Sequence, residues 1–474
     1  MINKLIEKYL AQAPNKKLIT DIDKTYTQSE FKKKVFFFKN KLKILPKNNN
    51  GIGILLNRNA DYLAAIFACF LTQKYYVPLS LRSSKRFIRE QIKDSRISYL
   101  IKYDKKKEIK IEAIQNRFKY ENDNNKKIAY IIFTSGSTGP KKGACISYKA
   151  FNSYINSIKK KFKKKFKSKS LLINGEFTFD IVNADIAFAL LYKTEICITP
   201  DPLNIFSFFL ILEKRRVESI YAVPTAWKNI IKTGNLMNKK KFSFIKQINS
   251  GGELFTKSLY KKIKKFAPKS KIYNFYGPTE FTINSHCAEI SDKKKLFLNG
   301  NATIGKALPD VDSKFLYNHN INNKFGELLL SGNQIMDGYV NSDEKPFLKI
   351  KNNTYYKTGD NFVKKKGYYF FKGRLKDYIK VSGYRVNIQE LENKLYNRLN
   401  SEGYFKLVNN GLHLFLNKNI SSKKLSNFFL KNFEWYEKPK KIIYVKEFPM
   451  LSNGKIARNK LKWINKYFMF IQGN

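Results

Sequence analysis

Small hydroxyl side chains, glycines and lysines follow an apolar segment at Tyr130–Gly143, which reads YIIFTSGSTGPKKG. Tyr130–Phe133 predict a buried strand, and the loop after it holds Thr134, Ser135, Gly136, Ser137, Thr138 and Gly139, with Lys142 shortly behind. Glycines and small hydroxyls let N–H and O–H groups surround phosphate oxygens, and a lysine adds a positive charge. The spacing is not that of a Walker A loop, because no Gly-Lys-Ser/Thr follows. We therefore expect a phosphate-binding loop of another kind rather than a plain surface turn.

A second segment, Asn274–Glu280, reads NFYGPTE and combines an aromatic ring, a rigid turn and a carboxylate. Tyr276, beside Gly277 and Pro278, offers a flat face for stacking. Glu280 is a hard oxygen ligand of the kind that Mg²⁺ prefers. This segment therefore offers a stacking surface and a magnesium ligand close together.

The phosphate loop resembles that of the adenylate-forming enzymes, which include acyl-CoA synthetases, luciferases and the adenylation domains of nonribosomal peptide synthesis. Five further segments are similar to motifs of this family and keep the family's order: Asn274–Glu280, Gly326–Tyr339 (GELLLSGNQIMDGY), Tyr356–Asp360 (YKTGD), Gly373–Asn387 (GRLKDYIKVSGYRVN) and Asn453–Arg458 (NGKIAR). The six matches cover most of the chain. Two positions depart from the pattern, since Pro140 stands one place early and Ala457 replaces a common Asp. We expect a structural role for Ala457.

The resemblance implies that ATP binds at these motifs with Mg²⁺ on Glu280, and that Lys455, Thr279 and Lys142 act in catalysis. Tyr276 would pack on adenine, and Asp360 would accept the hydrogen bonds of the ribose hydroxyls. Besides the phosphate loop, the nucleotide-binding residues implied by the family are Asn274, Phe275, Tyr276, Gly277, Pro278, Thr279, Asp360, Phe371, Arg374 and Lys455. Lys376 would lie at the hinge about which a small C-terminal domain rotates between the two half-reactions.

The segment Phe177–Asp185, which reads FTFDIVNAD, indicates the class of the acid substrate. In family members that activate amino acids, an Asp at this place pairs with the substrate's α-ammonium group, and Asp180 is similar. A buried carboxylate discriminates strongly, because a substrate without the amine leaves it unpaired. The competing interpretation is that Asp180 caps a helix over Ile181–Leu191, and both roles are compatible.

Other pocket positions follow from the same resemblance: Ile181, Ala184, Asn249, Gly251, Phe275, Ile283 and Asn284, with Lys455 contacting the substrate as well. Phe275 would shrink the pocket and favour a small amino acid. Asn249 or Asn284 could instead bond a polar side chain. The sequence leaves the identity and chirality of the amino acid open.

The acceptor is expected to come from outside the chain, because no phosphopantetheine attachment site occurs and only 19 residues follow Lys455. The resemblance to D-alanine–carrier protein ligases and to free-standing adenylation domains implies transfer to the phosphopantetheine thiol of a separate carrier protein. An acyl-CoA synthetase that transfers its acid to CoA is the alternative within the family.

The charge of the chain is unusual, with 91 Lys and Arg against 37 Asp and Glu, a net charge of +54. A non-enzymatic protein that binds anions or membranes is therefore a further hypothesis. Arginine supplies only 12 of the basic residues, whereas specific nucleic-acid readers favour its planar fork. We interpret the lysines as a bias of A/T-rich coding that could help to dock an acidic carrier, and expect no specific nucleic-acid partner.

The most basic run, Lys159–Lys169, reads KKKFKKKFKSK. A helix would place Phe162 and Phe166 on one face, where they could touch a membrane. A solvated helix continuing from Phe151 is the preferred interpretation.

The elements that must position these residues follow from apolar runs that alternate with amphipathic stretches. Strands are predicted at Gly51–Leu56, Tyr75–Leu79, Ser98–Ile101, Ile128–Phe133, Ser170–Ile173, Glu195–Ile198 and Ser219–Val223. Helices between them, such as Ala60–Leu71, predict an α/β class with layered, largely parallel sheets. Closer strands from about residue 300, at Lys314–Tyr317, Glu327–Ser331 and Tyr368–Phe371, predict a β-rich subdomain over about 300–374. A compact α+β tail follows, with a helix at Ile388–Leu399 and strands at Leu412–Leu416 and Lys441–Val445.

We therefore predict the fold of an adenylate-forming enzyme, with an N-terminal AMP-binding domain over 1–374 and a small mobile α+β domain over 375–474 that carries Lys455. The four cysteines, Cys69, Cys145, Cys197 and Cys287, form no CxxC pair, which excludes a disulfide scaffold. No apolar stretch approaches the ~20 residues that span a bilayer. We expect a cytoplasmic monomer.

Overall fold

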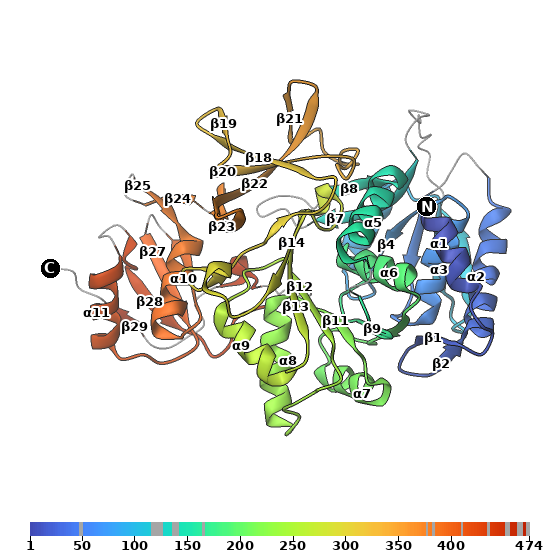
Figure 1. The fold of residues 1–474 in the computed structure, drawn as a ribbon, viewed down its shortest axis with the longest axis horizontal. Helices are drawn as coiled ribbons and strands as arrows, with labels where there is room; N and C mark the ends of the chain where they lie inside the picture. Colours follow the sequence, from blue (N-terminus) through green and yellow to red (C-terminus); the bar gives the residue numbers. More distant parts are fainter. Residues whose placement is uncertain are drawn as a thin grey trace. The chain divides into compact units, whose positions relative to one another are not determined.

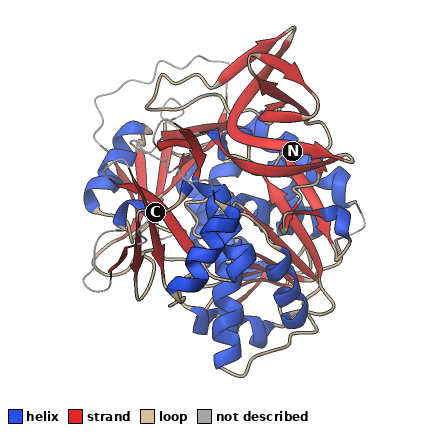
Figure 2. Cartoon of the chain, turned by 90° about the vertical axis from the view of Figure 1, so that its left-hand side faces the viewer, coloured by secondary structure: helices blue, strands red, loops and turns tan. Residues whose placement is uncertain are grey.

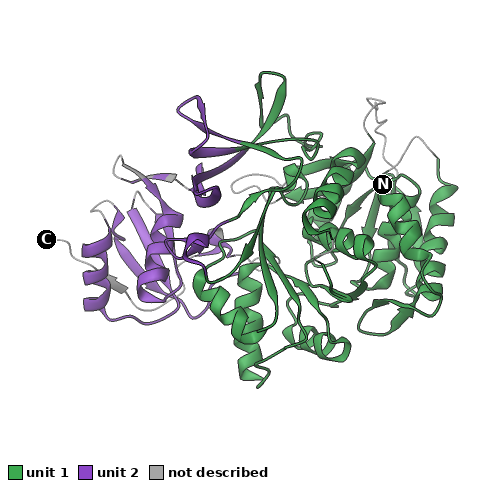
Figure 3. Cartoon of the chain, in the orientation of Figure 1, with its two compact units in different colours: residues 1–292, 304–313, 329–357 green, residues 293–303, 314–328, 358–474 purple. Residues whose placement is uncertain are grey.

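A computed structural model describes residues 1–46, 51–114, 127–134, 142–163, 166–375, 378–381, 384–408, 411–433, 437–450, 456–461 and 468–470. Seven of the predicted site residues lie outside the described residues: Ser135, Gly136, Ser137, Thr138, Gly139, Lys376 and Lys455. The chain forms two compact units (Figure 3). Unit 1 comprises residues 1–292, 304–313 and 329–357, and unit 2 comprises 293–303, 314–328 and 358–474. The boundary at 374/375 stays a prediction.

Unit 1 contains a nine-stranded sheet in the order β17-β14-β13-β12-β11-β9-β10-β1-β2. Its strands are β1 (Lys17–Thr20), β2 (Thr25–Thr27), β9 (Ser170–Ile173), β10 (Glu195–Ile198), β11 (Ser219–Tyr221), β12 (Gln247–Gly251), β13 (Lys271–Tyr276), β14 (His286–Ile290) and β17 (Lys306–Ala307). The neighbours from β13 to β10 are all parallel. Their carboxyl ends therefore meet at one edge, which is where ligands bind in open α/β sheets.

A second sheet of unit 1 has six strands in the order β6-β5-β3-β4-β7-β8. They are β3 (Gly51–Leu55), β4 (Tyr75–Pro78), β5 (Tyr99–Tyr103), β6 (Ile109–Ala113), β7 (Ile128–Thr134) and β8 (Lys142–Ser147). Strands β3, β4, β5 and β7 run parallel to one another. Strand β6 is antiparallel to β5, and β8 is antiparallel to β7. The predicted phosphate loop thus connects the last two strands of this sheet.

Helices separate the two sheets of unit 1. Helix α3 (Ala60–Leu71) packs on β3 and β4, α6 (Ile181–Tyr192) packs on β9, and α1 (Ile2–Leu10) touches both helices. The sequence of α3, ADYLAAIFACFL, is apolar around most of its circumference because it is buried on both sides. The other helices of unit 1 are α2 (Gln28–Lys43), α4 (Lys85–Asp94), α5 (Tyr148–Phe162), α7 (Ile205–Arg215), α8 (Pro224–Leu236) and α9 (Lys257–Phe266) (Figures 1 and 2).

Unit 2 ends in an α+β assembly. Its elements are β24 (Tyr378–Val381), β25 (Tyr384–Asn387), α10 (Ile388–Leu399), β26 (Gly403–Val408), β27 (Gly411–Leu416), α11 (Ser422–Asn432), β28 (Lys441–Tyr444) and β29 (Phe468–Phe470). The last four strands form one sheet in the order β26-β27-β28-β29, and Leu395, Leu414 and Phe429 contribute to its buried core.

The stretch between these regions is rich in strands, as predicted. It contains β15 (Phe297–Leu298), β16 (Asn301–Ala302), β18 (Asp312–Tyr317), β19 (Asn320–Asn322), β20 (Phe325–Ser331), β21 (Phe347–Ile350), β22 (Asn353–Lys365) and β23 (Tyr368–Arg374). Strands β18, β20 and β22 each have residues in both units.

The predicted α/β class is confirmed, and several elements begin and end where the sequence places them, including α3, β9, β10 and α10. Several predicted strands are one residue too long, and the largest difference is at β11, which stops at Tyr221 instead of Val223. Val223 is the N-cap of α8 and Pro224 is its first residue, a position that suits proline.

The helix predicted to continue from Phe151 reaches only the start of the lysine-rich run. Helix α5 ends at Phe162, with Lys163 as its C-cap. Phe162 and Phe166 are both buried and both pack against Phe188. These two rings belong to the core of unit 1, so they do not form an apolar face for a membrane.

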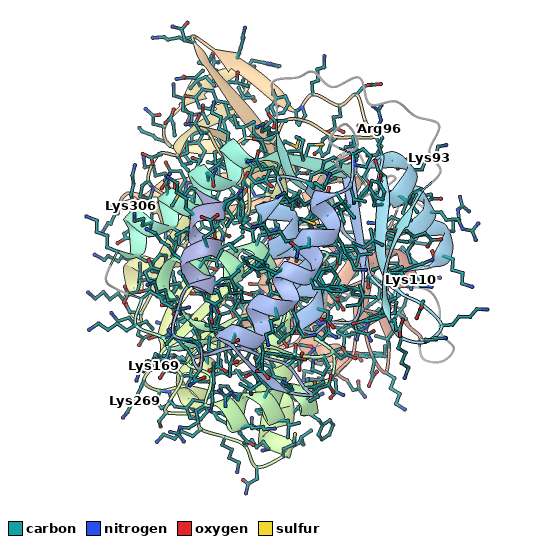
Figure 4. All side chains as sticks on the ribbon, turned by 90° about the vertical axis from the view of Figure 1, so that its right-hand side faces the viewer. Lys93, Arg96, Lys110, Lys169, Lys269 and Lys306 are labelled. Carbon is teal, nitrogen blue, oxygen red and sulfur yellow. The ribbon has the colours of Figure 1, made fainter. Side chains whose placement is uncertain are left out.

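The basic side chains of unit 1 are dispersed over its surface. Figure 4 labels examples at several places in this view: Lys93 and Arg96 near each other, Lys110, Lys169 near Lys269, and Lys306. The four cysteines are all buried and free. In the part of the chain that the structure describes, no helix is both long enough and apolar enough to cross a membrane.

Candidate active site

The two ends of the predicted phosphate loop are pinned by strand pairing. Thr134, the last residue of β7, is the register partner of Lys142, the first residue of β8. The Thr134 hydroxyl also donates to the carbonyl of Lys142 at 3.3 Å. Lys142, which lies where the sequence expects a phosphate-binding cation, is therefore held at the base of the loop.

Lys142 belongs to a charged network that includes the predicted magnesium ligand. Its ammonium group pairs with Glu344 and lies 5.4 Å from the ring centroid of Tyr339. The Tyr339 hydroxyl donates to Glu280 Oε1 at 2.8 Å. Burial, followed by the charge of Glu280, raises the pKa of Tyr339, which keeps this hydroxyl a donor. Tyr339 is aligned because residues 337–340 hydrogen-bond along β8.

The turn after β13 carries Thr279 and Glu280 and is held by Gln334. The Gln334 side-chain amide donates to the carbonyls of Phe281, Thr282 and Asn284, the last at 3.0 Å. The Thr282 hydroxyl donates back to the Gln334 carbonyl at 2.6 Å. Gln334 is buried, so this turn is fixed by donors that lie 50 to 53 residues further along the chain.

The same turn has unusual backbone conformations at a predicted site residue and at its neighbour. Ile283 has φ +72° although it is β-branched, and Thr282 has φ +51°. Such conformations persist only where surrounding contacts enforce them, and they gather at functional sites. Gly277 is required here, because a Cβ atom would lie 2.4 Å from the carbonyl oxygen of Ile283.

Asp180 lies at the carboxyl edge of the large sheet, where the chain leaves β9 and enters α6. It is the N-cap residue of α6 by position, as the competing interpretation predicts, but its side chain makes no capping hydrogen bond. Its charge acts on four buried tyrosines, raising the pKa values of Tyr76, Tyr130, Tyr154 and Tyr221 after the larger effect of burial. The carboxylate is thus within electrostatic range of several buried tyrosines.

Two of these tyrosines bind a predicted pocket residue. Asn284 accepts a hydrogen bond from the Tyr221 hydroxyl at 3.2 Å and donates to the Tyr154 hydroxyl at 3.2 Å. Asn249, by contrast, accepts from Gln247 within β12. Both asparagine side chains are buried and engaged by the protein itself.

The remaining pocket predictions gather at the same edge. Gly251 ends β12, and a Cβ there would lie 2.6 Å from the Phe275 carbonyl and 3.0 Å from the Tyr221 hydroxyl. Phe275 is buried with its ring 5.6 Å from that of Tyr221. Ile181 and Ala184 lie in the first turns of α6, beside Asp180. The edge therefore brings together residues from β11, β12, β13 and α6.

Asp185 is a second acidic residue of α6, only 4% exposed, and its Oδ2 atom has no hydrogen-bond partner among the described residues. Burial raises its pKa well above the ordinary value, so the neutral acid is favoured. The two acids of this helix therefore have different environments.

Unit 2 carries the predicted ribose site. Asp360 in β22 is the register partner of Arg374 in β23, and Arg374 Nε lies 3.0 Å from Asp360 Oδ1. The preceding Gly359 has φ +68°, and its N–H donates to Glu327 at 2.9 Å. Phe371 lies in the same hairpin, with its ring 5.4 Å from that of Phe362.

The segments that flank the predicted catalytic lysine are anchored, although Lys455 itself lies outside the described residues. Met450 and Ile456 form an antiparallel bridge on either side of it. Arg458 makes a two-pronged ion pair with Glu392 of α10, with both N–O distances 2.5 Å. Ala457 is buried, in agreement with a structural role.

Several residues that hold this site were not predicted from the sequence: Arg58, Tyr154, Tyr221, Gln334 and Tyr339. Tyr339 and Gln334 lie inside the GELLLSGNQIMDGY segment, but no local pattern indicates their partners. Tyr154 and Tyr221 read as ordinary core residues. Only their long-range contacts reveal them.

The fold is that of the adenylate-forming enzymes. The o-succinylbenzoate CoA synthetase from Bacillus subtilis, solved with its acyl-adenylate intermediate, has a TM-score of 0.78 at 19% identity over 98% of both chains. A four-domain nonribosomal peptide synthetase, holo-AB3403 bound to AMP and glycine, has a TM-score of 0.79 at 19% identity. That match covers 100% of this chain and 37% of that one.

The chain belongs to the AMP-binding enzyme family, whose profile matches residues 6–340. The D-alanine–D-alanyl carrier protein ligase of Bacillus licheniformis is 25% identical over 70% of this chain and 70% of its own length. The dapdiamide synthesis protein DdaD of Enterobacter agglomerans is 25% identical over 83% of this chain and 68% of its own. The chain spans only 7% of bacitracin synthase 3 of Bacillus licheniformis, at 24% identity. The chain is therefore an adenylate-forming ligase of the acid–thiol class.

Proposed function

We propose that this ligase uses ATP to activate an amino acid as aminoacyl-AMP and passes it to the phosphopantetheine thiol of a carrier protein. The assignment of an amino acid as the substrate rests on Asp180. Its carboxylate is not used to cap α6, and it lies at the sheet edge beside the predicted pocket residues. A carboxylate in such a place suits an α-ammonium group and disfavours an acid without one.

In the first half-reaction, a carboxylate oxygen of the amino acid attacks the α-phosphorus of ATP. The bond to the β-phosphate breaks, and pyrophosphate leaves. Negative charge builds up on the phosphate oxygens, where Lys142, Thr279 and Lys455 would stabilise it. Asp360 would orient the ribose through its two hydroxyls, with Arg374 holding the carboxylate in place. Tyr276, the partly exposed last residue of β13, would stack on the adenine.

Magnesium fits Glu280, because its carboxylate is fixed by Tyr339 and Mg²⁺ commonly needs only one or two protein carboxylates plus substrate phosphates. No group of three or more His, Cys, Asp or Glu side chains suited to a metal occurs among the described residues, which agrees with a site completed by ATP. When bound, the ion would neutralise charge on the triphosphate.

In the second half-reaction, the acceptor's sulfur attacks the acyl carbon, AMP leaves, and a thioester forms as the thiol proton is released. We propose a carrier protein as the donor of that thiol, supported by the similarity to D-alanine–D-alanyl carrier protein ligase. Coenzyme A is the alternative acceptor, supported by the fold of the CoA synthetase. The cytoplasmic location and the monomeric state stay predictions.

The test is pyrophosphate exchange with a panel of amino acids and of matched acids that lack the amine. Exchange with at least one amino acid, and loss of that exchange with its deaminated analogue, is the expected result. Exchange with plain aliphatic or aromatic acids alone would refute the amino-acid proposal. Purified carrier protein and CoA, offered side by side with the best acid, then identify the acceptor.

A further inference from the structure

Arg58 lies between β3 and α3, far from every motif, yet its guanidinium group is buried at the carboxyl edge of the large sheet. The side chain is 8% exposed. Its Nη1 donates to the carbonyl of Gly175 at 2.6 Å, its Nε to the carbonyl of Thr199 at 3.0 Å, and its Nη2 to the carbonyl of Ile173 at 3.3 Å. One side chain thus collects three carbonyls from two loops.

These carbonyls lie where β9 and β10 stop. Ile173 ends β9, and its carbonyl also accepts from the N–H of Thr199 at 3.2 Å. Gly175 and Thr199 lie beyond the strand ends, where the sheet offers their carbonyls few donors. A buried carbonyl without a donor costs about 1–3 kcal/mol. Arginine suits this place because its planar fork presents five donors, whereas the ammonium group of lysine is a single point charge.

Charged and aromatic contacts hold the fork in place. Glu176 lies 3.7 Å from Arg58 Nη1 and pairs also with Arg82 at 3.2 Å. Arg58 lies over the ring of Phe177, at 5.2 Å, and that ring stacks on Tyr62 with a centroid distance of 4.3 Å. Burial lowers the pKa of Arg58 to about 10, so it stays cationic at neutral pH.

The clamped segment leads straight to Asp180. The N–H of Phe179 donates to the carbonyl of Glu176 at 3.0 Å, which closes a turn just before Asp180. The Asp180 carbonyl in turn accepts from the N–H of Asn183 at 2.8 Å, the start of α6. A Cβ on Gly175 would lie 3.0 Å from Ile181, so the clamped loop also touches a predicted pocket residue.

We propose that Arg58 is the positioning residue for the acid-binding half of the site. It fixes the loop from Ile173 to Asp180, and through that loop it places the Asp180 carboxylate toward the substrate. This inference rests on the proposed function in assigning Asp180 to the acid substrate. It assigns Arg58 no contact with substrate and no role in ATP binding.

The test compares Arg58→Lys with Arg215→Lys. Arg215 is a matched control, since it is also largely buried and pairs with a carboxylate, that of Glu195, at 2.7 Å. Glu195 lies at the start of β10, however, whereas Arg58 binds the loop that follows the end of β10. The KM values for the acid and for ATP are measured in pyrophosphate exchange, together with Tm. We expect Arg58→Lys to raise the acid KM about tenfold with an ATP KM within about twofold of the wild type, because small misplacements of binding groups weaken binding strongly. Arg215→Lys should lower Tm and leave both KM values unchanged.

A second measurement distinguishes positioning from general loss of structure. Methylguanidinium added to Arg58→Ala should lower the acid KM toward the wild-type value, and should not do so for Arg215→Ala. Equal changes in both KM values, an unchanged acid KM in folded Arg58→Lys, or no rescue would each overturn the proposal. If the wild type accepts only acids without an amine, the proposed function fails. The Arg58 inference is then still decided by the KM of that acid.

Discussion

The two units hold their candidate site residues in different ways. In unit 2, Asp360 and Arg374 face each other as register partners in one hairpin, 14 positions apart in the sequence. In unit 1, the loops that carry Asp180 and Glu280 are held largely by side chains from distant parts of the chain. Arg58 reaches across 115 to 141 residues, and Gln334 reaches back 50 to 53.

The site residues of unit 2 are thus positioned by local strand pairing, and those of unit 1 by long-range side-chain contacts. Strand register positions every residue of a hairpin at once, so the loss of one side chain leaves the rest aligned. A loop held largely by one side chain loses much of its geometry when that side chain is removed, because several of its carbonyls lose a donor at once. A substitution in the hairpin of unit 2 should therefore remove only the function of the residue replaced. A substitution of Arg58 or Gln334 in unit 1 should instead impair the function of Asp180 or Glu280, whose loops they hold.

The largest effect is expected for Lys455→Ala, which removes the proposed catalytic charge of unit 2. The rate of aminoacyl-AMP formation should fall by at least about 100-fold, since one stabilising group at a developing oxyanion supplies that much. ATP binding, measured by calorimetry, should persist. The control is Lys460→Ala, which replaces an exposed lysine nearby and should keep the rate within about twofold of the wild type. Near-normal adenylation by Lys455→Ala would remove this residue from the mechanism.

Reciprocal effects are expected for Asp360→Asn and Asp180→Asn. The first should raise the ATP KM and the second the acid KM, each by about 10-fold or more, because charged hydrogen bonds contribute about 1.5–3 kcal/mol. Each variant should leave the other KM nearly unchanged. Steady-state pyrophosphate exchange with one substrate saturating measures both constants. A rise of both constants in either variant would contradict the assignment of separate subsites.

Gln334→Met keeps the length of the side chain and removes the donors that hold the turn of Glu280. We expect the free energy of unfolding to fall by about 1–3 kcal/mol and the Mg²⁺ requirement for exchange to rise. Gln247→Met is the control, because that buried amide donates to Asn249 within β12 and not to the turn. Urea unfolding and a magnesium titration provide the measurements. An unchanged magnesium titration would show that Gln334 does not position Glu280.

The last prediction concerns stability rather than catalysis, and Asp185, the neutral acid of α6. Its raised pKa means that the native state keeps a proton that the unfolded state loses above about pH 4. Wild-type stability should therefore fall, relative to Asp185→Asn, as pH rises above this value, by up to about 1.4 kcal/mol per pH unit until the native pKa is reached. Urea unfolding of both proteins from pH 5 to pH 8 tests this. A difference independent of pH would mean that Asp185 is ionised in the native state.

Local patterns were sufficient for much of the fold. The helix Ala60–Leu71 and the strands Ser170–Ile173 and Glu195–Ile198 were predicted with the bounds observed, because burial on both sides leaves an unbroken apolar run. The run Lys159–Lys169 was misread, because its two phenylalanines are buried by contacts with Phe188, which no local pattern records. Asp180 was predicted at the N-cap position that it occupies, but the sequence alone could not tell that its side chain makes no capping hydrogen bond.

The sequence by itself determined the family, the α/β class and the identity of the chemical groups, because these depend on residue types in a fixed order. Only the tertiary structure decided that Asp180 leaves its helix uncapped, that Tyr339 binds Glu280, and that Arg58 gathers the carbonyls of two loops. The physical reason is that motifs record which residues react. The donors that satisfy the surrounding buried carbonyls can come from any part of the chain that the fold brings near.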